Sequence, residues 1–147
     1  MLYVTYEATE DLEPGRLARI DEGRGWATII VDKRAPLEAV IRQLNIETSQ
    51  FLARADWYQL WGDDIASRHN PAARLRLEYI FLPGAPAPGV CIREVKGELH
   101  FYVDPAQTTE QFAAAACQAV QGLLDGGCWF QQYAGEIIDH SPEPMQV

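Results

Sequence analysis

The sequence predicts an α+β protein in which a mainly antiparallel sheet carries two helices on one face. Two stretches place apolar residues at helical spacing, and several short segments alternate apolar and polar residues as half-buried strands do. The two halves of the chain also resemble each other, which indicates two tandem βββαβ-like repeats related by pseudo-symmetry. Helices on one face of such a sheet are the simplest way to bury both apolar stripes.

The duplication is predicted by motifs that recur at a nearly constant distance. A Pro-Gly pair at 14–15 precedes Arg19, and another at 88–89 precedes Arg93, 74 positions later. Further along the offset is 72, for Val31 with Val103, Trp57 with Trp129, Gln59 with Gln131, and Ile65 with Ile137. We therefore expect one domain over residues 1–147, with copy one at about 1–71, copy two at about 74–142 and a disordered tail at 143–147.

The expected elements follow the same order in each half. Strands are predicted at about 2–7, 16–21, 26–32, within 57–68, 75–82, 90–95, 98–103 and 132–139, and helices at about 36–52 and 109–125. The stretch 57–65 also fits a helical face, but a strand is favoured because its counterpart contains Gly135 and two isoleucines. Thr108 and Gln111 form a predicted capping box for the second helix.

Each half is expected to contain a hairpin. In the second half, a turn at Lys96-Gly97 pairs Val90 with Val103 and Arg93 with His100. In the first half, a four-residue loop at 22–25 pairs Ala18 with Ile29, Ile20 with Ala27, and Arg19 with Thr28. This register makes Arg19 and Arg93 equivalent.

Composition and charge limit the classes of function. The net charge of −9 repels phosphate backbones and anionic lipids, so neither nucleic acid nor a membrane is expected as a partner. The amino terminus lacks the features of a signal peptide, and no apolar run reaches the roughly 20 residues of a membrane span. Three cysteines without CxxC spacing indicate free thiols and a cytoplasmic protein.

No motif in the sequence predicts catalysis, a metal or a cofactor. Cys128 precedes His140 by twelve positions, but no glycine-framed nucleophile motif surrounds it. The histidines and carboxylates lack ligand spacing, and no phosphate-binding loop is present. These motifs identify no protein family and no oligomeric state, and an enzyme is not favoured.

The candidate site consists of aromatic and amide residues that recur in both halves. They are Trp57, Gln59, Trp61, Trp129, Gln131 and Tyr133, with Arg19 and Arg93 as a matched pair that would hold an anion. The alternative is that both tryptophans are core residues that close the ends of the helices. Our leading hypothesis is a non-catalytic binding or regulatory protein with a recognition surface at the seam between the copies, whose partner is either a protein or a small molecule. A small enzyme or a small-molecule binder that uses the seam as a pocket is the alternative.

Overall fold

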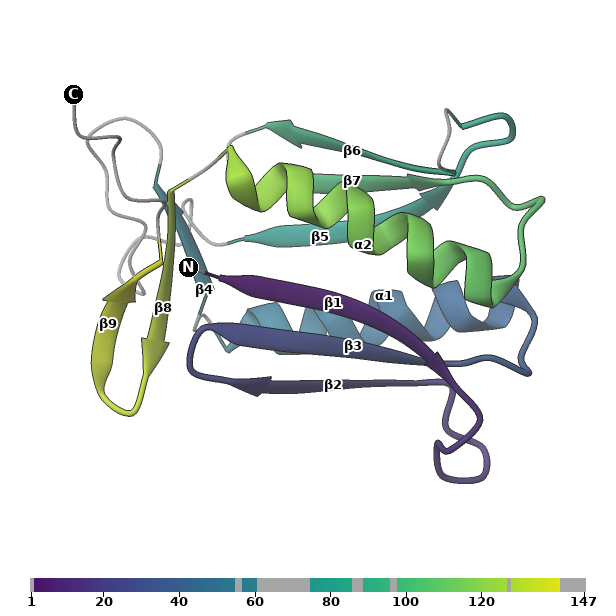
Figure 1. Ribbon diagram of the computed structural model, residues 1–147, viewed down its shortest axis with the longest axis horizontal. Coiled ribbons are helices and arrows are strands. Elements are labelled where there is room, and N and C mark those ends of the chain that lie inside the picture. Colours follow the sequence, from purple (N-terminus) through teal and green to yellow (C-terminus); the bar gives the residue numbers. More distant parts are fainter. Residues whose placement is uncertain are drawn as a thin grey trace.

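The computed structural model describes residues 2–54, 57–60, 75–85, 89–95, 98–126 and 128–140 (Figure 1). The elements are β1 (Tyr3–Thr9), β2 (Ala18–Gly23), β3 (Trp26–Asp32), α1 (Leu37–Ala53), β4 (Trp57–Leu60), β5 (Arg76–Phe81), β6 (Val90–Val95), β7 (Glu98–Val103), α2 (Thr109–Asp125), β8 (Cys128–Tyr133) and β9 (Glu136–Asp139). The protein is α+β, with a βββα layout in each half as predicted. The predicted tail at 143–147 and the turn at 96–97 lie outside the described residues.

The strands of the described ranges form three sheets instead of the single one expected. Two have the same topology, with orders β1-β3-β2 and β5-β7-β6, in which the first strand of each half runs parallel to the third. The third sheet, β4-β8-β9, is antiparallel and combines strands of both halves. The first two sheets stay separate because helix side chains bind the outer edges of β1 and β5, as shown below.

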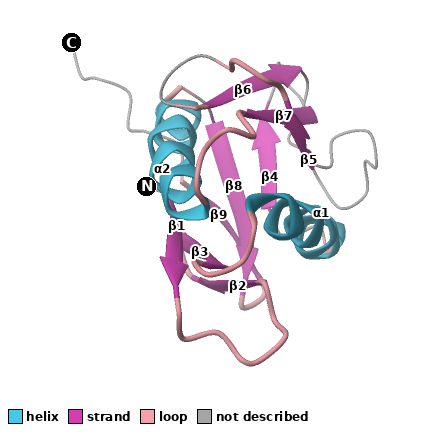
Figure 2. Ribbon diagram, turned by 90° about the vertical axis from the view of Figure 1, so that its right-hand side faces the viewer, coloured by secondary structure: helices cyan, strands magenta, loops and turns pink. Residues whose placement is uncertain are grey.

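The two helices lie on opposite sides of the core and not on one face of a sheet, which corrects the prediction (Figure 2). Helix α1 packs mainly on β5 and β2, and α2 packs mainly on β1 and β6. Two sheets and two helices thus surround one core, and β4 and β8 lie across one end of it (Figures 1 and 2). Each helix packs chiefly on the other half, since this arrangement covers the apolar stripes of both helices.

The register of the second hairpin is as predicted, but that of the first differs. Val90 pairs with Val103 and Arg93 with His100, whereas Ala18 pairs with Val31 and Arg19 with Ile30. The first turn contains only two residues, 24–25, because Gly25 adopts the positive φ of 80° that a tight turn requires. The shift is an even number of residues, so every side chain keeps its predicted face.

The corrected register removes the equivalence of the two arginines. With a constant offset of 72, Ala18 opposite Val31 corresponds to Val90 opposite Val103. Arg19 then corresponds to Cys91, and Arg93 to Asp21, so the predicted matched pair of arginines is wrong.

The stretch predicted as one strand at 132–139 is a hairpin of β8 and β9. Its turn, Ala134-Gly135, has positive φ at both residues, 52° and 83°. These angles are typical of a type I′ turn, which matches the twist of adjoining strands. In the first half, 57–60 is a strand as favoured, and 61–65 lies outside the described residues.

The two helices begin in different ways, and α2 alone of the two has a side-chain cap. Thr108 and Gln111 form the predicted capping box of α2, and Pro36 is the N-cap of α1. In the turns before the helices, Asp32 Oδ1 accepts the Arg34 N–H at 2.9 Å and Asp104 Oδ1 accepts the Ala106 N–H at 3.0 Å.

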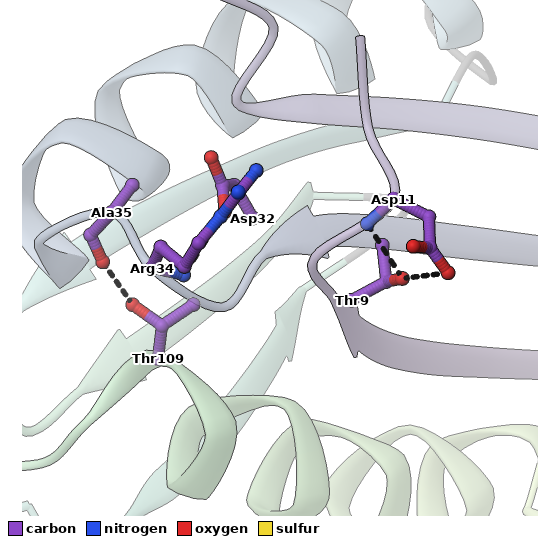
Figure 3. Close-up of polar contacts among 6 residues, drawn as sticks. All are labelled: Thr9, Asp11, Asp32, Arg34, Ala35 and Thr109. Carbon is purple, nitrogen blue, oxygen red and sulfur yellow. Dashed lines mark hydrogen bonds and ion pairs between the residues drawn. The ribbon is translucent and has the colours of Figure 1, made fainter. Parts of the chain in front are cut away.

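A side-chain hydrogen bond also joins the two halves at this end of the core. Figure 3 shows the Thr109 hydroxyl, at the start of α2, donating to the carbonyl of Ala35 before α1, at 2.9 Å. Arg34 and Asp32, also labelled there, form an ion pair at 3.4 Å, and the same view shows the contact of Thr9 with Asp11. The beginnings of α1 and α2 are therefore tied together directly.

Candidate functional site: an apolar cavity between the two halves

An apolar cavity of about 100 Å³ lies between the two halves of the chain, and we call it the seam cavity. Alternate residues of β1, β3, β5 and β7 point into it because neighbouring residues of a strand point to opposite faces. The last turns of α1 and α2 add Phe51, Leu52, Leu123 and Leu124, and β8 adds Trp129. The cavity therefore lies toward the carboxyl ends of both helices, where β8 crosses the core.

Most residues that line the cavity occur in pairs at a fixed offset. The pairs are Leu2 with Leu75 and Val4 with Leu77, 73 apart, and Ala27 with Leu99, Ile29 with Phe101, Thr48 with Val120, Phe51 with Leu123, and Leu52 with Leu124, 72 apart. Both halves thus contribute the same structural positions. The side chains differ in size, so the two walls of the cavity do not have the same shape.

The polar groups of two lining residues are engaged by other groups of the protein. The Thr48 hydroxyl donates to the carbonyl of Leu44, one turn earlier in α1, at 2.7 Å. The Tyr6 hydroxyl lies 2.7 Å from that of Tyr79. Burial, followed by the neighbouring Tyr79, raises the pKa of Tyr6 well above its usual value. The phenol therefore stays neutral at physiological pH and is a poor base.

Trp129 is the lining residue with an unsatisfied polar group. The side chain is 3% exposed, and its indole nitrogen, Nε1, is buried with no hydrogen-bond partner in the described part of the chain. Buried tryptophans usually find an acceptor for this N–H group. Trp129 thus contributes an apolar surface to the cavity, and its indole nitrogen is buried away from water.

Gln131 holds β8 against the first hairpin. The sequence predicted Gln131 as part of a recognition surface, but its side chain is 0% exposed. Its amide donates to the carbonyl of Gly23 and accepts the N–H of Gly25, both at 2.8 Å. The same oxygen accepts from His140 Nε2 at 2.9 Å, because an amide oxygen cannot donate. Gln131 therefore has a structural role, two residues from Trp129.

The helices bind the outer edges of β1 and β5 through equivalent positions. The Asn45 amide on α1 donates to the Tyr79 carbonyl and accepts its N–H, at 3.1 and 2.7 Å. The Cys117 thiol on α2, 72 positions later, accepts the Tyr6 N–H and donates to its carbonyl, at 3.0 and 3.2 Å. These contacts satisfy the N–H and carbonyl groups of Tyr6 and Tyr79, one residue of each edge strand, and fix the two tyrosines that meet beside the cavity.

The other predicted site residues whose side chains the structure describes do not line the cavity. Arg19 forms an ion pair with Asp21, at 3.1 Å, and Arg93 is exposed on β6. Tyr133 is 38% exposed near the β8–β9 turn. The side chains of Trp57 and Gln59 and the whole of Trp61 lie outside the described residues, although the backbone of β4 pairs Gln59 with Trp129.

Sequence reasoning missed Tyr6, Tyr79 and the two helix ends as parts of a site. The signal was the recurrence of Leu2, Val4 and Tyr6 as Leu75, Leu77 and Tyr79, but apolar alternation is equally typical of an ordinary core strand. Strand spacing alone does not say which buried residues surround a void.

Chemically, the seam cavity is suited to binding an apolar group. Among the described residues, no cluster of three His, Cys, Asp or Glu side chains gathers anywhere, and no described helix is long and apolar enough to cross a membrane. Comparison with protein-family models, curated proteins and solved structures finds no significant match for this chain.

Proposed function

We propose that this chain is a non-catalytic binding protein that holds a small apolar molecule in the seam cavity. The observation that carries the proposal is the lining itself, which comes from both halves and is almost entirely hydrocarbon. Empty apolar cavities reduce stability because their walls lose packing contacts. A bound apolar molecule restores those contacts, so a ligand that fits is favoured over water.

The volume of the cavity limits the size of the ligand. An engineered cavity of about 150 Å³ in another protein binds benzene. The seam cavity, at about 100 Å³, is smaller. A ligand no larger than benzene, of roughly four to six non-hydrogen atoms, or the end of a longer chain, is therefore the appropriate class.

The chemistry of the lining supports binding over catalysis. The Thr48 hydroxyl is engaged by Leu44, and the Tyr6 phenol is paired with Tyr79. Among the residues that the structure describes, neither group lies beside a base that would activate it as a nucleophile. These contacts favour a site that surrounds its ligand without reacting with it.

We also infer that the two halves are copies related by an approximate two-fold axis through the cavity. Identical strand orders, constant offsets and the equivalent contacts of Asn45 and Cys117 support this inference. An experimental structure tests it by superposing residues 2–53 on 75–125. A superposition that places Tyr6 away from Tyr79 contradicts it.

Titration with cyclopentane, followed by amide NMR, tests the proposed function. We expect resonances of Ile29, Thr48 and Val120 to shift and saturate. Ala27→Leu introduces the residue that the other half has at this position, Leu99, and fills the cavity, so it abolishes binding without lowering the melting temperature. Ala114→Leu, at an exposed position of α2, is the matched control and leaves binding unchanged. Unshifted cavity resonances in saturated cyclopentane exclude the proposed function.

A second candidate function is recognition of a protein partner. Tyr3 and Trp26 are neighbours across β1 and β3, and they are 56% and 42% exposed. Tyrosine and tryptophan are enriched among residues that dominate binding at protein interfaces. The test is cross-linking from native extract, in which a specific partner is lost with Trp26→Ala and retained with Leu82→Ala, another exposed apolar position.

The proposal includes a cytoplasmic location. Among the described side chains, the thiols of Cys91 and Cys117 are both free, as is usual for a reducing compartment.

Duplex DNA is not expected to bind at physiological salt because of the net charge of −9.

A further inference from the structure

The seam cavity is not centred between the two halves of the chain. Ile20 of β2 lines it, whereas Ile92, at the equivalent position of β6, does not. Likewise, Tyr6 of β1 lines the cavity and Tyr79 of β5 does not. The cavity thus extends across all three strands of the sheet β1-β3-β2, the lower one in Figure 1. Of the described residues in the sheet β5-β7-β6, by contrast, those that line it belong to β5, β7 and the residue before β5.

The sizes of the lining side chains account for this displacement. Where a strand residue and its counterpart both line the cavity, the first-half residue is equal or smaller, and the unequal pairs are Val4 with Leu77, Ala27 with Leu99, and Ile29 with Phe101. On the helices the one large difference is opposite, since Phe51 is larger than Leu123. Because a core relaxes only partly around missing atoms, small side chains leave unfilled space beside them. The unfilled space therefore lies against the sheet of the first half.

We propose that a ligand in the seam cavity lies against the sheet β1-β3-β2, and that Ala27 is the residue that determines the largest ligand accepted. This inference rests on the proposed function, since it concerns the same cavity. The ligand class is a compact hydrocarbon group that rests on the Ala27 methyl group. The second half of the chain provides the facing wall, which is already filled at the equivalent position by Leu99.

The position of Ala27 explains why this residue determines the size. It lies on β3, the central strand of its sheet, directly opposite Val4 on β1, and it is 5% exposed. Strands on both sides hold its backbone, so a longer side chain at this position extends into the cavity instead of turning away. Ala27 lacks three of the carbon atoms of Leu99, which makes it the smallest side chain in the lining.

The pairing of Ala27 with Leu99 makes the inference testable by exchange. Ala27→Leu/Leu99→Ala keeps the composition of the core, and volume-conserving changes of this kind are the ones that a core tolerates best. If the difference between these two residues places the cavity, the exchange moves it from the first sheet to the second. The ligand is then expected to bind at the equivalent place in the other half.

The test locates bound cyclopentane through the δ1-methyl groups of Ile20 and Ile92. These residues occupy equivalent strand positions, and both are partly buried and packed against the core. With isotope-labelled isoleucine methyl groups in otherwise deuterated protein, nuclear Overhauser effects (NOEs) report which methyl group the ligand contacts. In the wild-type protein we expect NOEs from cyclopentane to Ile20 and none to Ile92.

The exchange variant is expected to reverse this pattern. Ala27→Leu alone abolishes binding, whereas Ala27→Leu/Leu99→Ala binds cyclopentane within about tenfold of the wild-type affinity, because the total space is conserved. Its NOEs are to Ile92 and not to Ile20. Val4→Leu/Leu77→Val, which exchanges a pair that differs by one carbon atom, is the matched control and keeps the NOE to Ile20.

A single substitution tests the size limit independently. Ala27→Val adds two carbon atoms at a strand position, where valine is favoured. We expect this variant to lose cyclopentane and to retain the smaller cyclopropane. Equal affinity of Ala27→Val and the wild-type protein for cyclopentane contradicts a size limit at Ala27.

The outcomes separate this inference from the proposed function. Wild-type NOEs of equal strength to Ile20 and Ile92 place the ligand centrally, so the inference is wrong and the apolar site remains. A folded exchange variant that does not bind, or that keeps its NOE to Ile20, also overturns the inference. If cyclopentane shifts no cavity resonance of the wild-type protein, the proposed function fails and the inference fails with it. Should the exchange variant not fold, the wild-type NOEs and Ala27→Val decide.

Discussion

The hydroxyl groups of Tyr6 and Tyr79 meet in the core at 2.7 Å, each carried by the first strand of its own half. Both rings also pack edge-on against Phe112 of α2. The pair thus joins the two sheets at a point where no backbone hydrogen bonds connect β1 with β5 in the sheet orders described. Four predictions follow from this pair and from the contacts around it.

Removing both hydroxyls of the pair is expected to destabilise the protein by less than the sum of the two single removals. Tyr6→Phe or Tyr79→Phe leaves the other hydroxyl buried without its partner and costs about 1–3 kcal/mol. The double variant costs less than the sum of the two single variants, because no unsatisfied group remains. Urea unfolding measures the three values, with the exposed Tyr133→Phe as control. Additive single effects contradict an energetic coupling between the hydroxyls.

Stability is expected to fall in alkaline solution because of the same pair. Burial raises the pKa of both Tyr6 and Tyr79 well above the usual value of about 10. In the unfolded chain both phenols ionise near that value, while in the folded protein they remain protonated. Stability is therefore complete below about pH 10 and declines as the pH rises above it. Urea midpoints from about pH 8 to about pH 11 show the decline, and an equal decline in the Tyr6→Phe/Tyr79→Phe variant would refute its assignment to this pair.

Because Asn45 and Cys117 make equivalent contacts, we expect position 117 to accept an asparagine side chain. Asn45→Ala strands the Tyr79 N–H and carbonyl and costs about 1–3 kcal/mol. Cys117→Asn is expected to be neutral or stabilising, because an amide donates and accepts better than a thiol. Thermal unfolding compares Cys117→Asn with Cys117→Ala. Greater destabilisation by asparagine than by alanine argues against equivalent positions.

Gln131 is expected to be essential for stability. Gln131→Ala leaves the Gly23 carbonyl and the Gly25 N–H without their partner, at a cost of about 1–3 kcal/mol. Gln118→Ala, an exposed glutamine of α2, changes stability by less than about 0.5 kcal/mol and is the matched control. Equal melting temperatures for the two variants would show that the hydrogen bonds of Gln131 contribute nothing net.

Local sequence patterns determined the bounds of α2 and the register of the second hairpin. The helix over 109–125 has the predicted bounds, since its apolar stripe and the Thr108 capping box act within a few residues. The second hairpin has the predicted register because side-chain alternation and a short turn are also local.

Tertiary structure decided the pairing of the first hairpin and the separation of the sheets. A two-residue loop and a four-residue loop both place Ala18 and Ile20 on the same face of the sheet. The apolar pattern therefore could not choose between the two loop lengths. The buried Gln131, over 100 positions away, binds both sides of the observed turn. Likewise, Asn45 and Cys117 occupy the strand edges that a single sheet would have used.

For the candidate site too, the sequence predicted one part and the tertiary structure decided the other. The sequence marked Trp129 and Gln131 through their recurrence, but their roles depend on groups distant in the chain. Gln131 is buried because it meets a turn of the other half, and Trp129 borders a cavity because the helices and sheets of both halves meet around it. A sequence specifies which side chains leave water, whereas the space left between them arises only when separate elements pack together.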